Sequence, residues 1–222
     1  MATSKKYDLL PVKRENDMFR VTFDMFTPRP HFILLPKLGV QGMRKDHSLK
    51  NKQAQQLIVT AREMLASSNI SSGTLSIHRG SWMRSKKSRT AHFHLCVDVT
   101  NYLRIFEAKR VFERNKKSAY ARNVKEYPYK TYHREAVEII ERDRATNSLT
   151  NMQSTSENAE NLVYHSKHPK IAFSGNGTTE DLKNILIKMQ TYAEGNVLIR
   201  DKDGNHPGCH LCLNLGSDSG TY

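Results

Sequence analysis

The chain has 222 residues and carries 35 Lys and Arg against 22 Asp and Glu, a formal net charge of +13. The excess lies in the first 150 residues, which hold 29 basic and 14 acidic groups, whereas the remaining residues hold 6 and 8. A hydrophobic content of 37% argues against a fully disordered chain, no apolar run approaches the roughly 20 residues of a membrane span, and three cysteines fit a reducing compartment. We therefore expect a basic cytoplasmic or nuclear protein that makes no membrane contact.

The pattern of apolar and polar residues predicts the first elements of the chain. Residues 1–18 are polar and are predicted to form a basic N-terminal arm. The period-two pattern of 19–26 and the apolar run of 31–35, closed by Pro36-Lys37, each predict a strand. Ser48 is predicted to cap a helix with an apolar stripe formed by Ala54, Leu57, Ile58, Ala61, Met64 and Leu65. Strands at 74–78 and 91–99 follow, joined by the basic segment 79–89.

The second half of the chain repeats this order more briefly. Charged helices are predicted at 102–122 and 132–145, and residues 146–162 form a linker rich in Ser, Thr and Asn. A strand at 171–173 precedes a helix that is capped by Thr178, ends before Gly195 and buries Leu182, Ile185, Leu186, Met189 and Ala193. A hairpin of residues 197–199 and 209–215 closes the predicted series.

Similar last strands suggest an internal duplication. His92-Phe-His-Leu-Cys-Val-Asp-Val99 and Gly208-Cys-His-Leu-Cys-Leu-Asn-Leu215 share His-Leu-Cys. The expected fold class is α+β, with two pseudo-symmetric strand–helix–strand–strand units, antiparallel sheets and flanking helices. The first unit spans 19–145, including a charged helical extension at 102–145, and the shorter second unit spans 163–222.

One predicted strand carries a candidate chemical site. His92, His94 and Cys96 share a face because side chains alternate along a strand. The adjoining hairpin is basic, and no acidic residue lies between Glu63 and Asp98. An anion is the natural ligand of such a surface, and the candidate phosphate-binding residues are Arg79, Ser81, Arg84, Lys86 and Lys87.

These residues resemble the histidine triad superfamily of nucleotide hydrolases and transferases over roughly residues 19–100. The resemblance consists of the strand ending in Pro36-Lys37, the following helix and strand, and a His-φ-His-φ-x-φ strand about 60 residues downstream. It implies that His94 attacks an α-phosphorus to form a nucleotidyl-histidine. It also implies that His92 orients this group or binds phosphate. The third motif position holds Cys96, where the family usually has histidine.

Two other functions fit the same residues. His210 and Cys212 repeat the His94-Leu-Cys96 pattern, which resembles two-histidine phosphoesterases that use one such strand from each half. Alternatively, the chain is a catalytically silent protein that binds nucleotides, or RNA or DNA through its basic surface. The expected substrate is a nucleotide or a 5′-phosphorylated nucleic-acid end. No metal and no cofactor is expected, since Cys209 and Cys212 would face opposite ways on a strand, and the oligomeric state is left open.

Overall fold

A computed structural model describes residues 11–23, 31–37, 48–80, 92–98, 100–102, 104–105, 150–151, 162–165, 170–173, 176–199, 202–204 and 207–216. The strands are β1 (Pro11–Glu15), β2 (Phe19–Phe23), β3 (His31–Pro36), β4 (Thr74–Gly80), β5 (Phe93–Cys96), β6 (Thr150–Asn151), β7 (Leu162–His165), β8 (Lys170–Phe173) and β9 (Gly208–Asn214). The helices are α1 (Asn51–Ser67) and α5 (Thr179–Tyr192), and α5 continues into a π-helical turn, η3 (Ala193–Val197). The protein is therefore a mixed α+β protein, and none of the described helices could span a membrane.

The described strands form one sheet in the order β1-β2-β3-β5-β4-β9-β8-β7-β6. In its first half, β5 lies between β3 and β4 and is antiparallel to both. In its second half, β9 lies between β4 and β8, antiparallel to the former and parallel to the latter. The contact between β4 and β9 runs over all seven residues of each strand and joins the two halves of the chain.

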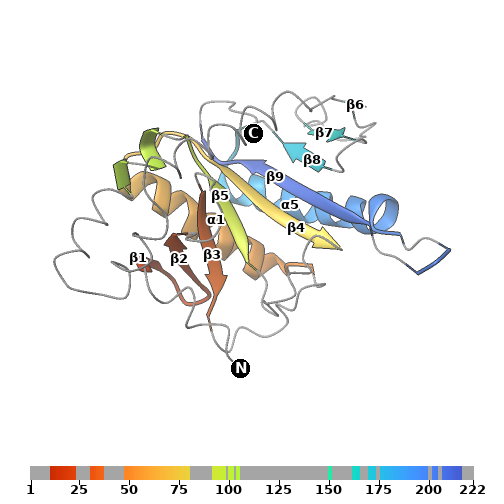
Figure 1. Ribbon diagram of the computed structural model, residues 1–222, viewed down its shortest axis with the longest axis horizontal. Coiled ribbons are helices and arrows are strands. Elements are labelled where there is room, and N and C mark those ends of the chain that lie inside the picture. The colour runs from red at the N-terminus through yellow and green to blue at the C-terminus, as the bar shows by residue number, and fades with distance from the viewer. Residues whose placement is uncertain are drawn as a thin grey trace, which may run out of the picture.

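Both helices cover one face of this sheet (Figure 1). The apolar stripe predicted for α1 is buried there, and so are the predicted apolar residues of α5. They pack on the inward side chains of the strands in one core, which includes Phe19, Phe93, Leu75, Leu211 and Ile171. Both helices thus cover the same side of the sheet. The opposite side is formed by the alternate strand residues that point away from the helices.

The strand pairing does not follow the predicted repeat. The similar strands β5 and β9 have different neighbours, because β5 is antiparallel to both of its partners whereas β9 is parallel to β8. The two halves instead share the order strand, helix, parallel strand: β3–α1–β4 and β8–α5–β9. In this comparison β9 occupies the place of β4, and His210 lies opposite His78.

Several predicted boundaries are corrected. The N-terminal arm contains β1, which pairs with β2, and the linker contains β6. Val197 lies in η3 rather than in a hairpin strand, and Gly195 lies inside this turn rather than beyond the helix. α1 begins after Lys50, whose backbone N–H donates to the Gln53 side chain at 2.9 Å, so Ser48 is not the cap. Of the predicted helix 102–122, residues 102 and 104–105 are helical, and helix 132–145 lies outside the described residues.

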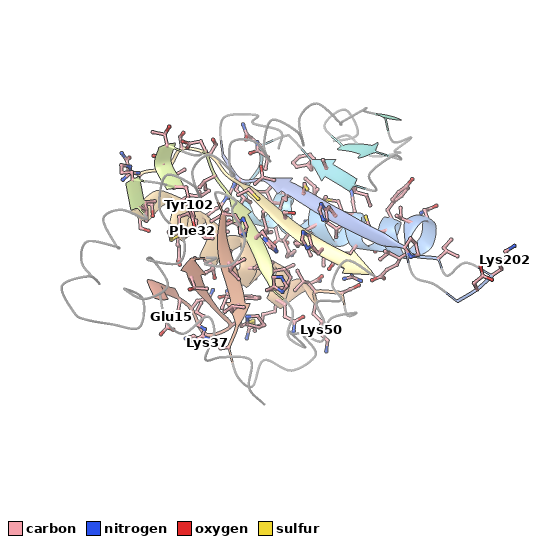
Figure 2. All side chains as sticks on the ribbon, in the orientation of Figure 1. Glu15, Phe32, Lys37, Lys50, Tyr102 and Lys202 are labelled. Atoms are coloured by element: carbon pink, nitrogen blue, oxygen red, sulfur yellow. The ribbon has the colours of Figure 1, made fainter. Side chains whose placement is uncertain are left out.

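One buried and one exposed side-chain contact stabilise the first half of the sheet (Figure 2). The ring of Phe32 on β3 packs against that of Tyr102 with centroids 5.3 Å apart, and both side chains are fully buried. At the other end, Lys37 forms an ion pair with Glu15 at 3.4 Å, which fastens β1 to the residue after β3. Such exposed pairs contribute little free energy, so the aromatic contact is the stronger of the two.

Gly80 ends β4 in a conformation that requires glycine. Its φ is +64°, and a Cβ at this position would lie 2.1 Å from the carbonyl oxygen of Pro207. Any side chain would therefore push apart the ends of β4 and β9.

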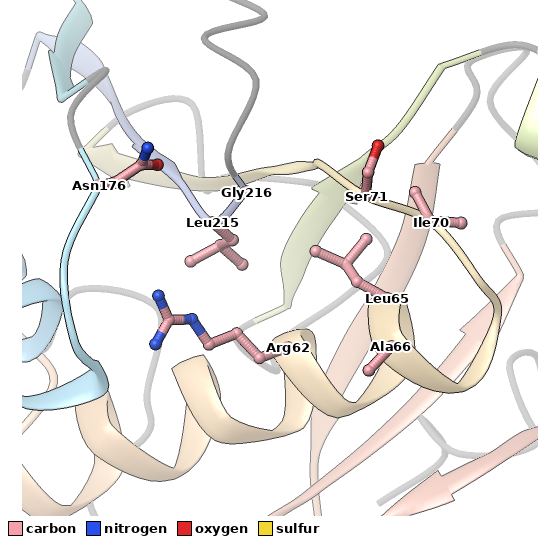
Figure 3. A pocket seen from close by; sticks show the side chains of 8 residues that line it. All are labelled: Arg62, Leu65, Ala66, Ile70, Ser71, Asn176, Leu215 and Gly216. Carbon is pink, nitrogen blue, oxygen red and sulfur yellow. The ribbon is translucent and has the colours of Figure 1, made fainter.

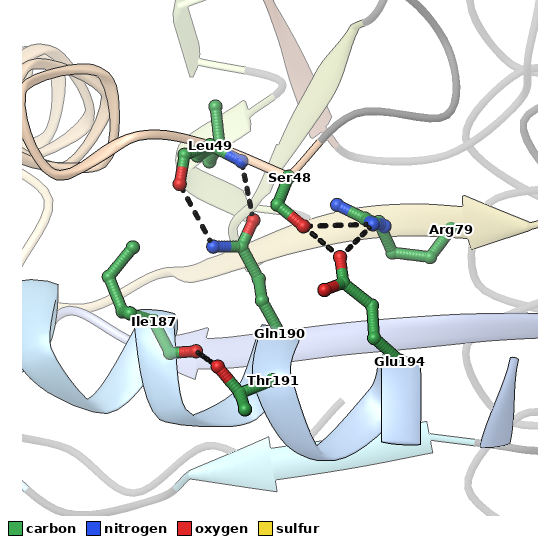
Figure 4. A network of polar contacts seen from close by, with 7 residues as sticks. All are labelled: Ser48, Leu49, Arg79, Ile187, Gln190, Thr191 and Glu194. Carbon is green, nitrogen blue, oxygen red and sulfur yellow. Dashed lines mark hydrogen bonds and ion pairs between the residues drawn. The ribbon is translucent and has the colours of Figure 1, made fainter. Parts of the chain in front are cut away.

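Polar contacts fasten the chain before α1 to the end of α5 (Figure 4). The buried Gln190 side chain accepts from the backbone N–H of Leu49 at 2.8 Å and donates to its carbonyl oxygen at 3.2 Å. One amide group thus satisfies both backbone groups of a buried residue 141 positions away.

We expect Gln190→Leu to lower the free energy of unfolding by about 1–3 kcal/mol, because it leaves two buried backbone groups of Leu49 without partners. Urea denaturation followed by circular dichroism measures the loss. Gln55→Leu, on the exposed side of α1, is the matched control and is expected to change stability by less than about 0.5 kcal/mol. Equal losses in the two variants would contradict this role of Gln190.

Candidate functional site

The face of the sheet opposite the helices carries a cluster of imidazoles at its centre. Most residues of this face are buried, including Thr22, Ile33 and Ser76. Four histidines remain partly exposed among them: His78, His92, His94 and His210. A fifth, His31, is buried beside them. Adjacent strands thus bring polar, titratable rings together at the centre of a face whose residues are mostly buried.

Strand register explains how the rings meet. His94 lies opposite Ile33 on β3 and Ser76 on β4, so His31 and His78 are its diagonal neighbours. The ring centroids of His94 and His31 are 4.6 Å apart, and those of His94 and His78 are also 4.6 Å apart. His92 lies 5.1 Å from His94. His94 is therefore surrounded by three imidazoles.

The row continues onto the strand supplied by the second half of the chain. His78 and His210 are register partners across β4 and β9, and their rings stack with centroids 4.1 Å apart and an interplanar angle of 8°. His78 also stacks on His94, at an angle of 26°. The three rings form a continuous stack over β5, β4 and β9, which we call the histidine row.

Burial and the neighbouring imidazoles determine the protonation state of His94. Its Nε2 atom is buried and has no hydrogen-bond partner among the described residues. Burial, and then the neighbouring His31, His78, His92 and His210, lower the pKa of His94 well below its usual value. The imidazole is consequently neutral at pH 7 and keeps a lone pair on one ring nitrogen.

The three cysteines fall into two environments. Cys96 and Cys212 lie on the histidine face: Cys96 is the register partner of His31 and Thr74, and the Cys212 thiol is 3.9 Å from the hydroxyl of Ser76. Cys209 packs into the core, where burial raises the pKa of its thiol to about 12. Cys209 and Cys212 thus face opposite sides of β9, as alternation along a strand predicts.

Arg79 was a predicted phosphate-binding residue, but the structure turns it away from the histidines. Alternation along β4 directs it to the helix face, where it is buried and forms an ion pair with Glu194 at 2.8 Å. It also donates to the hydroxyl of Ser48 at 3.2 Å (Figure 4). The other predicted phosphate ligands lie outside the described residues: Ser81, Arg84, Lys86 and Lys87.

The structure thus brings together five of the predicted site residues on one face: His92, His94, Cys96, His210 and Cys212. Sequence reasoning did not assign His31 and His78 to the site. His78 is in phase with Thr74 and Ser76 in the alternation of β4, and this signal could have placed it on the polar face. His31 opens an apolar run and is in phase with Ile33 and Leu35, so its pattern is that of a core position.

The described part of this face has no carboxylate near the histidine row, since β3, β4, β5 and β9 contain no acidic residue. Among the residues that the structure describes, no group of three or more His, Cys, Asp or Glu side chains is arranged to hold a metal ion. Protonation of the row would bring several positive charges together, and an anion would relieve their repulsion.

A separate pocket of about 420 Å³ lies on the helix side of the molecule (Figure 3). It is bordered by α1, the residues before α5 and the chain that follows β9, and none of the described histidines lines it. The guanidinium of Arg62 on its wall already donates to the Gly177 carbonyl at 2.6 Å and to the Thr179 hydroxyl at 3.0 Å. Arg62 therefore fastens α1 to the start of α5.

Comparison with known proteins found no matching family model, no matching curated protein and no matching solved structure.

The lowered pKa of His94 makes stability depend on pH. Below about 6.5 the unfolded chain takes up a proton that the folded protein excludes, so the free energy of unfolding falls as the pH decreases, by up to about 1.4 kcal/mol per pH unit for this group. Urea denaturation at pH 7.5 and 5.5 measures the fall. We expect His94→Gln to reduce it and Lys188→Gln, at an exposed position of α5, to keep it. An unchanged pH dependence in His94→Gln would contradict the assignment.

An experiment can distinguish a role of Arg79 in stability from its predicted role in phosphate binding. Glu194→Gln leaves a buried guanidinium without its counter-charge and is expected to cost about 1–3 kcal/mol of stability. The double variant Arg79→Met/Glu194→Gln should lose less than the sum of the two single changes, as a thermodynamic cycle of urea denaturation experiments would measure. If Arg79→Met instead left stability unchanged and abolished binding of inorganic pyrophosphate, the predicted phosphate role would be right.

Proposed function

We propose that this protein is a nucleotide hydrolase or nucleotidyltransferase, similar to the histidine triad superfamily, in which His94 forms a nucleotidyl-histidine intermediate. The observation that carries the proposal is the state of this side chain: its Nε2 is buried without a hydrogen-bond partner among the described residues, and its lowered pKa keeps it neutral. A neutral imidazole is a good nucleophile toward phosphorus, and the phosphoramidate that it forms is labile enough to be resolved.

The position of His94 supports the same proposal. The strand that ends in Pro36-Lys37 pairs with β5, and β5 also pairs with β4, which follows α1. The two segments that carry the resemblance therefore lie side by side on adjacent strands. His94 stands on the middle strand of these three, so a substrate lying on this face would contact β3 and β4, and neighbouring side chains would have to move to open the buried Nε2 to its phosphorus.

The reaction consists of two displacements at the α-phosphorus. The lone pair of Nε2 of His94 forms a bond to phosphorus, and the bond from phosphorus to the leaving group breaks, so that the leaving group takes the electron pair and a proton. Water or another acceptor then attacks the same phosphorus. The P–N bond breaks, its electron pair returns to Nε2, and the proton of the attacking water is lost. With water as acceptor, the product is a nucleoside 5′-monophosphate.

His92, the residue before β5, and Cys96 on β5 share the face of His94 and flank it. His92, whose ring is 5.1 Å from that of His94, is placed to bind the phosphoryl oxygens or to supply a proton. Cys96 stands at the position that is usually histidine in the family. A thiol with a usual pKa near 8.5 is a weak proton donor, so we expect leaving groups that need strong protonation to react slowly.

Intact mass spectrometry after incubation with adenosine 5′-phosphoramidate tests this proposal. We expect an adenylylated protein in the parent chain and in the Lys188→Gln control, and no adduct in His94→Gln. Cys96→His is expected to increase turnover, because an imidazolium donates a proton more readily than a thiol. Neither adduct nor turnover in the parent, or equal turnover in His94→Gln, would contradict the proposal.

A two-histidine phosphoesterase is the second candidate, favoured by the placement of His94 and His210 on one face with His78 stacked between them. In this case a 2′,3′-cyclic nucleotide would be cleaved without an adduct, and His94→Ala and His210→Ala would lose activity equally. A catalytically silent binding protein would give neither reaction. Its affinity for nucleic acid would fall steeply with salt and survive His94→Ala.

A further inference from the structure

The pocket on the helix side of the molecule lies where the two halves of the chain meet. The first half contributes the end of α1 and the turn after it, and the second half contributes Asn176, Leu215 and Gly216. In Figure 3, Asn176 and Ser71 stand at opposite ends of the opening, with Leu215 and Gly216 between them. The volume of about 420 Å³ falls within the range of small-molecule sites. A ligand in this pocket would contact both halves at once.

Backbone contacts fix the shape of the pocket. The backbone N–H of Leu215 donates to the carbonyl oxygen of Gly73 at 2.9 Å. The chain at Gly216 lies so close to the turn after α1 that a Cβ on this residue would be 2.3 Å from the Cα of Ser72. The two walls are therefore packed against each other, and the pocket between them is preformed.

The floor of the pocket is apolar. Leu65, Ile70 and Leu215 line it, and all three belong to the hydrophobic core. The exposed residues Ser71 and Asn176 form a polar rim. An apolar group that lies on this floor leaves water and extends the contacts of the core, which is favourable. The floor thus favours a ligand with an apolar part.

Arg62 places a positive charge beside this floor. Among the described residues that line the pocket, it has the one charged side chain. Its two acceptors, the Gly177 carbonyl and the Thr179 hydroxyl, are uncharged, and it forms no ion pair with an acidic residue in the described part of the chain. The guanidinium has five N–H groups, of which these bonds use two. Arg79, in contrast, has the carboxylate of Glu194 as its counter-charge.

The acidic residues in the first turn of α5 do not neutralise Arg62. Asp181 accepts from the backbone N–H of Thr178 at 2.9 Å and from its hydroxyl at 2.6 Å. Glu180 forms an ion pair with Lys183. Neither carboxylate lines the pocket. The positive charge on the wall is therefore not balanced by these two groups.

We propose that this pocket binds a small carboxylic acid with an apolar tail. The carboxylate pairs with Arg62, and the tail lies on Leu65, Ile70 and Leu215. A planar carboxylate matches the fork of a guanidinium, and its single negative charge balances the single positive charge, whereas a phosphate dianion would keep an excess. The pocket and the histidine row lie on opposite sides of the sheet, so this site is independent of the proposed function.

The first experiment separates the two parts of the ligand. Methyl NMR spectra of the full chain at pH 7.5 are titrated with hexanoate, with 1-hexanol, which has the tail without the charge, and with acetate, which has the charge without the tail. We expect hexanoate to shift the methyl signals of Leu65, Ile70 and Leu215 saturably. It should bind about tenfold or more tightly than 1-hexanol, the gain typical of a charge-assisted hydrogen bond, and more tightly than acetate by at least as much.

The second experiment locates the site with variants. Arg62→Met keeps an unbranched side chain on α1 without the charge, so hexanoate should bind no more tightly than 1-hexanol, whose affinity should not change. Ala66→Phe fills the pocket from an exposed position, leaves Arg62 in place and should weaken both ligands about tenfold or more. Lys188→Gln, which removes a charge elsewhere, and Ser67→Phe, which adds a ring outside the lining, are the matched controls and should bind hexanoate as the parent does.

Melting temperatures show whether each variant folds. Arg62→Met also loses its bonds to the start of α5, and if it does not fold, Ala66→Phe decides the outcome. In the parent, the absence of a saturable shift at tens of millimolar hexanoate refutes the proposal, and so does equal affinity for hexanoate and either of the other two compounds. Unchanged hexanoate binding in Ala66→Phe also refutes it. Adduct formation at His94 is measured without hexanoate, so the failure of one proposal leaves the other standing.

Discussion

The antiparallel pairing of β4 with β9 is the constraint on which the rest of this molecule depends. It joins the two halves of the chain through seven consecutive residue pairs and turns two small sets of strands into one sheet. With the strands fixed, α1 and α5 lie on the same face and share one hydrophobic core. The same register places His210 opposite His78, so the packing of the two halves and the composition of the polar face follow from a single interaction.

Alternation along β4 places neighbouring residues on opposite faces of the sheet, where they make different contacts. His78 joins the row of imidazoles, whereas the buried side chain of Arg79, the next residue, forms an ion pair with Glu194 on the helix side of the sheet. One positive charge of the basic segment is therefore used for packing and is not available to a ligand. Net charge summed over a segment thus gives an incomplete account of the charge at a site, because the period of the strand decides which side each residue faces.

Short-range patterns were sufficient for much of the fold. The apolar stripe of α1, the apolar run of β3 and the strand patterns of β4 and β5 are local features, and the elements that they predict are present. The relation between the halves could not be read in this way, because the pairing of β5 and β9 depends on contacts between residues that are distant in the sequence. For the site, the face shared by His92 and His94 was predictable, whereas the stack of His78 on His210 depends on a register that no local pattern contains. The π-helical turn η3 was not predicted, because a glycine usually lies just beyond the end of a helix. Gly195 instead lies within this turn.

The separation along the chain between β4 and β9 has a consequence for how the protein forms. Ser76 and Cys212, which meet across this pairing, are 136 residues apart. Contacts of such long range carry a large loop-closure cost and form late in folding, whereas β3, α1, β4 and β5 can assemble from nearby residues. During synthesis the first half can therefore collapse before β9 is available to pair with the edge of β4. Until β9 arrives, this edge exposes unpaired backbone groups that could pair with another chain. Pairing with β9 thus completes the histidine row and also covers this edge of β4.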